Sequence, residues 1–200
     1  MSGFLSRTLF ATVIFTLVSG CAAQLARPDY AALARSDPRR HHYVIGVADV
    51  VSVGVWKDPT LTAEGPVDPD GTLTVPLVGQ VHVAGQTVEQ VRQTVTARLA
   101  AYVKDPVVDV AVKEVNSYRF TVAGKVEHPG MFSPRYFVTV SEAIAMAGGP
   151  NRYASPSDIV VVRNEAGRPV RIPVDYDAIL SGTDPEQDIA VLSGDTVLVP

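Results

Sequence analysis

The sequence predicts an α+β protein with two small modules in tandem, which follow an export signal and a linker. Fifteen Gly and 15 Pro separate short valine-rich segments, a pattern typical of short strands joined by turns. Two Thr-Val capping boxes, starting at Thr87 and Thr139, predict two helices. Similar segments surround each helix, which divides the chain into modules of about 75 to 85 residues, enough for a small core.

Composition and charge exclude several classes of protein. Seventeen Lys and Arg stand against 21 Asp and Glu, for a net charge of −4 and a pI near 5.5. This balance argues against a nucleic-acid binder, whose surface would be basic. Charged residues make up 19% and hydrophobic residues 46%, which excludes wholesale disorder. The single cysteine, Cys21, cannot form an internal disulfide or a multi-cysteine zinc site.

Residues 1–20 indicate a signal peptide. Arg7 precedes an uncharged, mostly apolar run over residues 8–20, which is shorter than the roughly 20 residues of a membrane-spanning helix. The run ends in Leu17-Val-Ser-Gly-Cys21, which resembles the bacterial lipobox. That resemblance implies cleavage between Gly20 and Cys21 and lipidation of the Cys21 thiol. Ala22 follows, rather than the Asp that retains many lipoproteins at the inner membrane, so we expect outer-membrane anchoring with the protein facing the periplasm.

Two other readings of the N-terminus stay open at this point. Residues 8–20 could form a buried helix of a cytosolic protein, or cleavage near Cys21 could leave an unmodified thiol. Residues 21–42, the lipidated N-terminus and linker, lack strand alternation and contain two prolines and four arginines. We interpret them as a flexible, solvated tether. The Arg39-Arg40-His41-His42 segment could instead contact lipid headgroups or hold a metal, although no further ligand stands at a suitable spacing.

The first module spans residues 43–116. Residues 50–56 alternate apolar and small side chains, as a half-buried strand does. Asp70-Gly71 is a strong turn signal, with short strands over 72–75 and 80–84 after it. The capping box at Thr87 begins a helix whose apolar stripe runs from Val88 to Tyr102, and Asp105-Pro106 is expected to stop it. A valine-rich strand follows over 108–112.

The second module spans residues 117–200 and repeats this order. A strand over 118–124 leads to a turn at Pro129-Gly130. The helix that begins after Thr139 ends at Gly148-Gly149, where glycine suits a left-handed cap. Strands over 159–163 and 170–174 follow, and Gly194-Asp195 turns into a last strand over 197–199.

Motifs for catalysis, metal binding or cofactor binding are absent from the sequence, so we expect no enzyme, no cofactor and no metal. Asp68-Pro-Asp-Gly71 matches only part of a calcium loop, because Leu77 stands where a bidentate Glu is needed. His82 and His128 are expected at ordinary surface positions. Asp175 and Asp177 could form a glycosidase carboxylate pair only if other features supported it, and Trp56 is expected in the core.

Several segments together resemble the outer-membrane polysaccharide export (auxiliary) lipoprotein family over residues 43–200. In the first module these are Tyr43-Val-Ile-Gly-Val-Ala-Asp49 and the stretch from Val67 through Asp70-Gly71 to Gly85. In the second they are Val122 to Pro129-Gly130, Ala147-Gly148-Gly149 and Gly194-Asp195 to Pro200. Ala48 departs from the family pattern, which usually has Gly before the Asp.

The resemblance implies a polysaccharide export N-terminal domain followed by a soluble-ligand-binding β-grasp (SLBB) domain, two small β-grasp-like modules. It implies a homo-oligomeric periplasmic ring that guides capsular polysaccharide or exopolysaccharide outward as cargo, with an inner-membrane polysaccharide co-polymerase and without covalent chemistry. The motif turns would be structural, and the substrate-binding residues stay unassigned.

A different class of function stays open, a monomeric periplasmic lipoprotein that binds glycan or peptidoglycan, because fold alone does not fix function. Longer relatives in the family end in a membrane-crossing helix, and no sequence for one follows Pro200. We therefore expect a separate outer-membrane β-barrel partner, unless the natural chain extends further.

Overall fold

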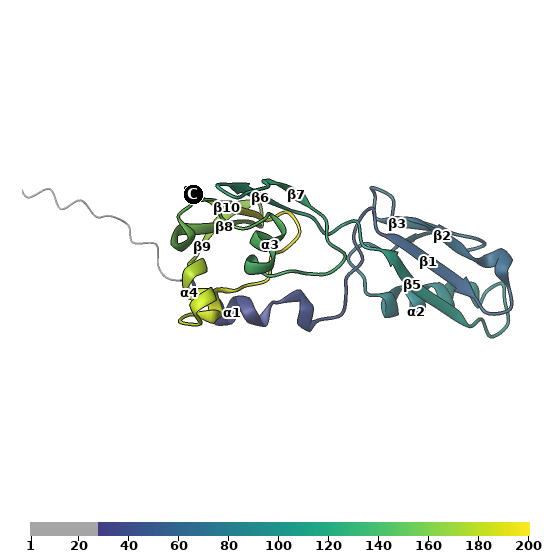
Figure 1. The fold of residues 1–200 in the computed structure, drawn as a ribbon. Helices are drawn as coiled ribbons and strands as arrows, with labels where there is room; N and C mark the ends of the chain where they lie inside the picture. Colours follow the sequence, from purple (N-terminus) through teal and green to yellow (C-terminus); the bar gives the residue numbers. More distant parts are fainter. Residues whose placement is uncertain (1–27) are drawn as a thin grey trace, which may run out of the picture.

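The computed structural model describes residues 28–200, which form two lobes side by side, as Figure 1 shows. The chain starts at the lobe that contains its C-terminus, crosses to the first domain and returns (Figure 1). Cys21 and the expected signal peptide lie outside the described residues. Both lobes combine helices with sheets, which confirms the α+β class.

The first domain contains a three-stranded antiparallel sheet in the order β2-β1-β5 and a separate hairpin, β3-β4. Its elements are β1 (Val50–Val55), η2 (Pro59–Leu61), β2 (Ala63–Pro66), β3 (Thr72–Val75), β4 (Gly79–His82), α2 (Val88–Leu99) and β5 (Val108–Glu114). Alternate residues of β1 are buried, and Val91, Val95 and Leu99 of α2 complete the core. This burial follows from the period-2 pattern of the strand and the 3.6-residue period of the helix.

Two aromatic residues of this domain lie where the sequence did not predict them. Trp56, expected in the core, is 71% exposed, because it follows the last paired residue of β1. Helix α2 ends at Leu99, so Tyr102 falls outside the apolar stripe and is exposed. Lys57 and Asp105 nearby both adopt positive φ, at 63° and 50°, which turns the chain away from the regular elements.

The second domain contains a five-stranded mixed sheet in the order β7-β6-β10-β8-β9, in which only β6 and β10 are parallel neighbours. Its elements are β6 (Phe120–Gly124), β7 (Gly130–Phe132), α3 (Val140–Met146), η3 (Pro156–Asp158), β8 (Ile159–Glu165), β9 (Arg168–Val174), α4 (Tyr176–Ser181), η4 (Pro185–Gln187) and β10 (Thr196–Val199). The two domains share a capped helix between strands, but the second adds β9 and α4 before its last strand.

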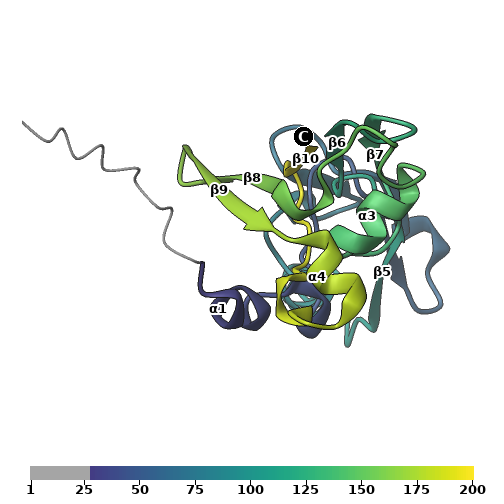
Figure 2. The same cartoon turned by 60° about the vertical axis from the view of Figure 1, so that its left-hand side comes forward.

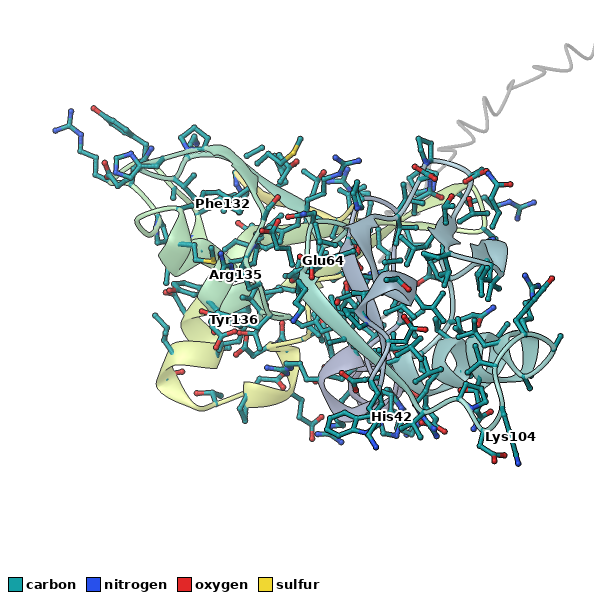
Figure 3. All side chains as sticks on the ribbon, turned by 90° about the vertical axis from the view of Figure 1, so that its right-hand side faces the viewer. His42, Glu64, Lys104, Phe132, Arg135 and Tyr136 are labelled. Atoms are coloured by element: carbon teal, nitrogen blue, oxygen red, sulfur yellow. The ribbon has the colours of Figure 1, made fainter. Side chains whose placement is uncertain are left out.

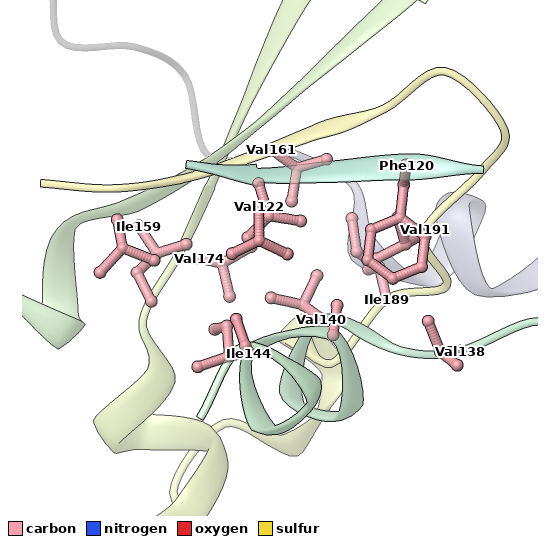
Figure 4. Close-up of a cluster of buried hydrophobic side chains, with 14 of the residues drawn as sticks. Phe120, Val122, Val138, Val140, Ile144, Ile159, Val161, Val174, Ile189 and Val191 are labelled. Atoms are coloured by element: carbon pink, nitrogen blue, oxygen red, sulfur yellow. The ribbon is translucent and has the colours of Figure 1, made fainter. Parts of the chain in front are cut away.

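The core of the second domain lies between the sheet and α3, and Figure 4 shows it. Phe120 and Val122 of β6 point toward Val140 and Ile144 of α3 in this view. Each of these four side chains is at most 1% exposed. Both predicted capping boxes are present, with Gln90 and Glu142 closing them. They satisfy two N–H groups at each helix start.

Residues 28–42 form an ordered arm, where the sequence predicted a flexible tether. Helix α1 (Tyr30–Arg35) and η1 (Pro38–Arg40) follow one another. Tyr30 is buried in the core of the second domain, and its hydroxyl donates to the carbonyl of Pro173 at 2.5 Å. Helix α1 lies beside η4 (Figure 2). A helix of six residues gives a weak sequence signal, since its stability comes from packing against the second domain.

Candidate functional site

The junction between the two domains is organised around the carboxylate of Asp49. Its Oδ2 accepts from the Tyr43 hydroxyl at 2.5 Å and from the Gly46 N–H at 2.8 Å. Its Oδ1 accepts from the backbone N–H groups of Asn116 and Ser117, both at 2.8 Å. One buried side chain of the first domain thus binds the segment that leads into the second.

Burial and hydrogen bonding act in opposite directions on the Asp49 pKa. Burial raises it, but the bonds from Tyr43, Gly46, Ser117 and Asn116 outweigh burial and hold the pKa below its ordinary value. Burial, and then the hydrogen bond to Asp49, raises the pKa of Tyr43. The pair is therefore an ionised carboxylate and a neutral phenol at neutral pH.

Close packing at the junction explains why residue 46 is glycine, and the backbone angle explains why the family usually has glycine at position 48. A Cβ at Gly46 would lie 2.3 Å from the Ser117 side chain, so only glycine fits there. Ala48 has a φ of 74°, a left-handed conformation that glycine adopts without a steric penalty. The turn is formed with Ala48, at some conformational cost.

The last turn of the second domain reaches the same junction. The Gly194 N–H donates to the Arg119 carbonyl at 2.8 Å, and the Ser193 hydroxyl donates to the Ser117 carbonyl at 2.7 Å. Beneath them, Asp195 accepts from the guanidinium of Arg163, whose Nη2 lies 2.7 Å from Oδ2. Both side chains of this ion pair are buried. Motif residues Asp49, Gly194 and Asp195 are thereby brought to one place.

An open groove of about 570 Å³ runs along this junction. Residues 44–48 line one side, and Asn116, Ser117, Arg119, Ser193 and Gly194 complete the lining. Val44 and Val47 are exposed in it. The groove is open, its lining mixes apolar and polar groups, and the Ser193 hydroxyl is already bonded to the backbone. The residues here fix the two domains to each other and include no nucleophile paired with a base.

The other motif turns form a second cluster within the second domain. The His128 N–H donates to the Ala147 carbonyl at 2.8 Å, which ties the segment before Pro129-Gly130 to Gly148-Gly149. Both Gly148 and Gly149 have positive φ, whereas Gly130 opens β7 in extended backbone. A Cβ on Gly148 would meet the Glu127 side chain at 2.9 Å.

Asp70-Gly71 serves the first domain alone. The Asp70 carboxylate accepts from the N–H and the hydroxyl of Thr72, and Gly71 has a φ of 81°. The Gly71 carbonyl accepts from the N–H groups of Val83 and Ala84. This turn therefore connects β3 and the end of β4 within one domain and contributes nothing to the junction.

The residues considered above for catalysis or metal binding do not come together in one site. Asp175 is the N-cap of α4 and accepts from the Ala178 N–H at 2.9 Å, while Asp177 is exposed in the first turn. His82 and His128 lie on different domains and are exposed. Among residues 28–200, no group of three His, Cys, Asp or Glu side chains could hold a metal ion. No helix within that same range is long and apolar enough to cross a membrane.

Sequence reasoning missed three residues of the junction as site residues: Tyr43, Ser117 and Arg163. Arg163 gave one usable signal, because it occupies a core position of the alternating pattern of β8 and therefore needed a buried acidic partner. Ser117 gave none, since its role depends on backbone contacts between residues 68 positions apart.

Two family profiles match the chain, one on each domain. The first, described as polysaccharide biosynthesis/export protein, matches residues 37–113. The second, described as SLBB domain, matches residues 119–173. Asn116 and Ser117, whose N–H groups bind Asp49, lie between the two matched segments.

Curated proteins with similar sequences are named for polysaccharide export or transport. The EPS I polysaccharide export outer membrane protein of Ralstonia solanacearum is 33% identical over 68% of this chain and 42% of its own length. The capsule polysaccharide export protein of Haemophilus influenzae is 27% identical over 76% of this chain and 42% of its own. The polysialic acid transport protein of Escherichia coli is 31% identical over 78% of this chain and 28% of its own. The chain thus spans about two fifths or less of the length of these relatives.

Proposed function

The chain belongs to the polysaccharide biosynthesis/export protein family, and from this premise we propose that it is a periplasmic, ring-forming component of a capsular polysaccharide or exopolysaccharide export apparatus at the outer membrane. The observation that carries the proposal is the tandem of two matched domains, residues 37–113 and 119–173, in one chain. The relatives named above share this stretch and are named for export or transport of polysaccharide.

In this proposal the protein does no covalent chemistry. Asp49 and Asp195 hold backbone and side-chain donors in place, which is a structural use of a buried carboxylate. The hydrogen bonds from Asn116 and Ser117 to Asp49 would keep the two domains of each copy at one angle, as a ring of identical units requires. The polysaccharide would move through a shaped passage lined by several copies.

We further propose that lipid on Cys21 anchors the protein to the outer membrane. The ordered arm supports an orientation for the anchored molecule, because it is fixed to the second domain from Tyr30 onward. With only eight residues between Cys21 and Tyr30, an extended chain spans at most about 30 Å. The second domain would then lie nearest the membrane, with the first domain directed into the periplasm.

The far end of the first domain is where we propose contact with an inner-membrane polysaccharide co-polymerase. Trp56 and Val107 are paired there through the Trp56 N–H and the Val107 carbonyl, and both side chains are more than half exposed. Exposed aromatic side chains are enriched at protein interfaces.

Gene deletion together with native mass measurement tests the proposed function. Deletion should stop surface polysaccharide while precursor synthesis continues, and purified lipidated protein should have the mass of a closed oligomer. Normal surface polysaccharide in a deletion strain without a duplicate gene would contradict the export role. A stable monomer that binds glycan would favour the monomeric binding lipoprotein instead.

The anchor has its own test in Cys21→Ser. A hydroxyl cannot accept the lipid in place of the thiol, so this variant should remain as precursor or appear in the soluble fraction. Mass spectrometry of the membrane-bound wild-type protein provides the direct measurement. An unmodified Cys21 in that fraction would rule out lipidation.

A further inference from the structure

One face of the five-stranded sheet in the second domain is not covered by any helix of that domain. Strand register assigns eleven side chains to this face, and we call the nine that lie away from the β8–β9 turn the open face. They are Thr121, Ala123, Met131, Val160, Val162, Arg171, Pro173, Thr196 and Leu198. Their strand neighbours Val122, Val161, Ile172 and Val197 point into the core, where α3 packs. In Figure 1 the helices α1, α3 and α4 all lie on the same side of this sheet.

The open face is mostly apolar and carries positive charge. Two cross-strand rows form it, one from Met131 through Thr196 to Arg171 and one from Ala123 through Leu198 to Pro173. Met131 is 68% exposed, and the ladder positions include no acidic residue. Arg119 precedes β6 and lies two residues before Thr121, so it is placed on the same side of the sheet as the open face. Among residues 28–200, neither Arg119 nor Arg171 has an ion-pair partner.

The opposite side of the same domain has complementary character. Residues 175–188, which include α4 and η4, contain five acidic residues and no basic one. In α4, Tyr176 and Ile179 pack against the core, so Leu180 is left 65% exposed beside exposed Asp177. Asp177 and Glu186 have no ion pair within the described chain. Leu180 and the acidic Asp177 and Glu186 therefore complement the open face, which is mostly apolar and has two arginines without an ion pair within the described chain.

The free edges of the sheet cannot provide this contact by strand addition. In β9, Pro169 and Pro173 alternate with Arg171 on the side away from β8, so two of the three outward positions lack an N–H. The Pro173 carbonyl is also occupied by Tyr30. Strand β7 has three residues and is flanked by Pro129 and Pro134. Such edges resist pairing with other strands, which leaves the open face for association.

We propose that the open face of one copy binds the α4–η4 segment of a second copy, with Val162 and Leu198 against Leu180 and with Arg171 facing Asp177 or Glu186. This proposal rests on the proposed ring function and names its contact. The two surfaces lie on opposite sides of one domain, so the contact is head-to-tail. A head-to-tail contact between identical chains closes into a ring when the rotation allows.

Cross-linking between two single-cysteine variants tests the pairing in the mature lipidated protein. Val162→Cys protein mixed with Leu180→Cys protein should form a cross-linked dimer with a short bismaleimide, whereas neither protein alone should. Lys104→Cys, at the far end of the first domain and labelled in Figure 3, is the matched control and should cross-link with neither. Wild-type protein controls for Cys21. Cross-linking of Val162→Cys with itself would show a symmetric face-to-face contact and overturn the proposal.

Charge exchange provides a second, independent test. Arg171→Glu should weaken association at least about tenfold in analytical ultracentrifugation, because it places like charges across the contact. Adding Asp177→Arg and Glu186→Arg to the same chain should restore association, and Lys104→Glu should leave it unchanged. All these positions are exposed, so thermal unfolding should match the wild type.

The outcomes separate this contact from the export role. Wild-type-like oligomers in Arg171→Glu without the Val162–Leu180 cross-link would reject the contact while the export proposal stands. The expected cross-link together with normal surface polysaccharide in a deletion strain would support the contact and reject the export role.

Discussion

Ala48 stands where the family motif usually has glycine, and this difference points to a residue with an unusual backbone angle. The family usually has glycine at this position, and in the structure Ala48 has a φ of 74° between Gly46 and Asp49. For residues other than glycine, the left-handed region costs about 1–2 kcal/mol. The sequence indicated an unusual turn here, although not which contacts hold it. Those contacts involve Val67, whose carbonyl accepts from the Ala48 N–H.

Ala48→Gly should therefore stabilise the first domain. We expect a gain of about 0.5–1 kcal/mol, which is the relief of strain less the entropy that glycine loses on folding. Urea unfolding followed by circular dichroism measures the change. Ala111→Gly, in β5 and without a positive φ, is the matched control and should destabilise. Equal effects of the two substitutions would contradict the strain argument.

Asp49→Asn should cost about 3 kcal/mol of stability, because an amide cannot accept all four donors and one of its own N–H groups would face another donor. The folded pKa of Asp49 lies below its ordinary value of 3.8. Its contribution is therefore complete above about pH 4 and is lost as the pH falls through the folded pKa.

Unfolding measured between pH 7 and pH 2 checks both statements. Wild-type stability should fall more steeply in the acid range than that of Asp49→Asn, so the two curves should converge. Asp68→Asn, on an exposed residue of the same domain, should stay close to the wild type at every pH. Parallel curves for wild type and Asp49→Asn would contradict the assigned role.

At the scale of elements, the sequence predicted what local chemistry determines. Both capping boxes, the left-handed glycines after α3 and the alternating strands are local signals, and the structure contains them. Trp56 and helix α1 depend on distant packing, and there the predictions differed. An apolar residue at the end of a strand is buried only if another element covers it, and nothing in the local pattern says whether one does.

The arm makes the clearest case, because a six-residue helix is stable only through its contacts. Tyr30→Ala should cost the second domain about 3 kcal/mol by removing a buried aromatic ring. Tyr30→Phe, which keeps the ring and removes the hydrogen bond to the Pro173 carbonyl, should cost about 1 kcal/mol. Urea unfolding measures both, with Tyr153→Ala on an exposed ring as control. A wild-type value for Tyr30→Ala would mean that the arm is a free tether after all.

At the scale of the whole molecule, the hydrogen bonds of Asp49 and the packing of Tyr30 together fix the positions of the first domain and the arm relative to the second domain. The chain passes between the domains at residues 42–43 and 116–117, and Asp49 binds the second passage through two backbone N–H groups. Tyr43 lies at the first passage, where its ring contacts Phe137 with centroids 6.2 Å apart. Both passages are thus fixed, so the far end of the first domain has a defined position relative to the arm.

That far end contains the single tryptophan of the chain, which gives it a direct spectroscopic reporter. Trp56 is 71% exposed, so its emission in the native protein should resemble that of the urea-unfolded chain. Adding the periplasmic domain of the proposed partner, an inner-membrane polysaccharide co-polymerase, should shift the emission to shorter wavelength and reduce quenching by acrylamide. Both changes follow from removal of water around the indole ring. Val107→Ala should weaken this response, whereas Tyr153→Ala, on an exposed ring of the second domain, should leave it intact. An unchanged spectrum alongside demonstrated binding would move the partner contact away from this end of the molecule.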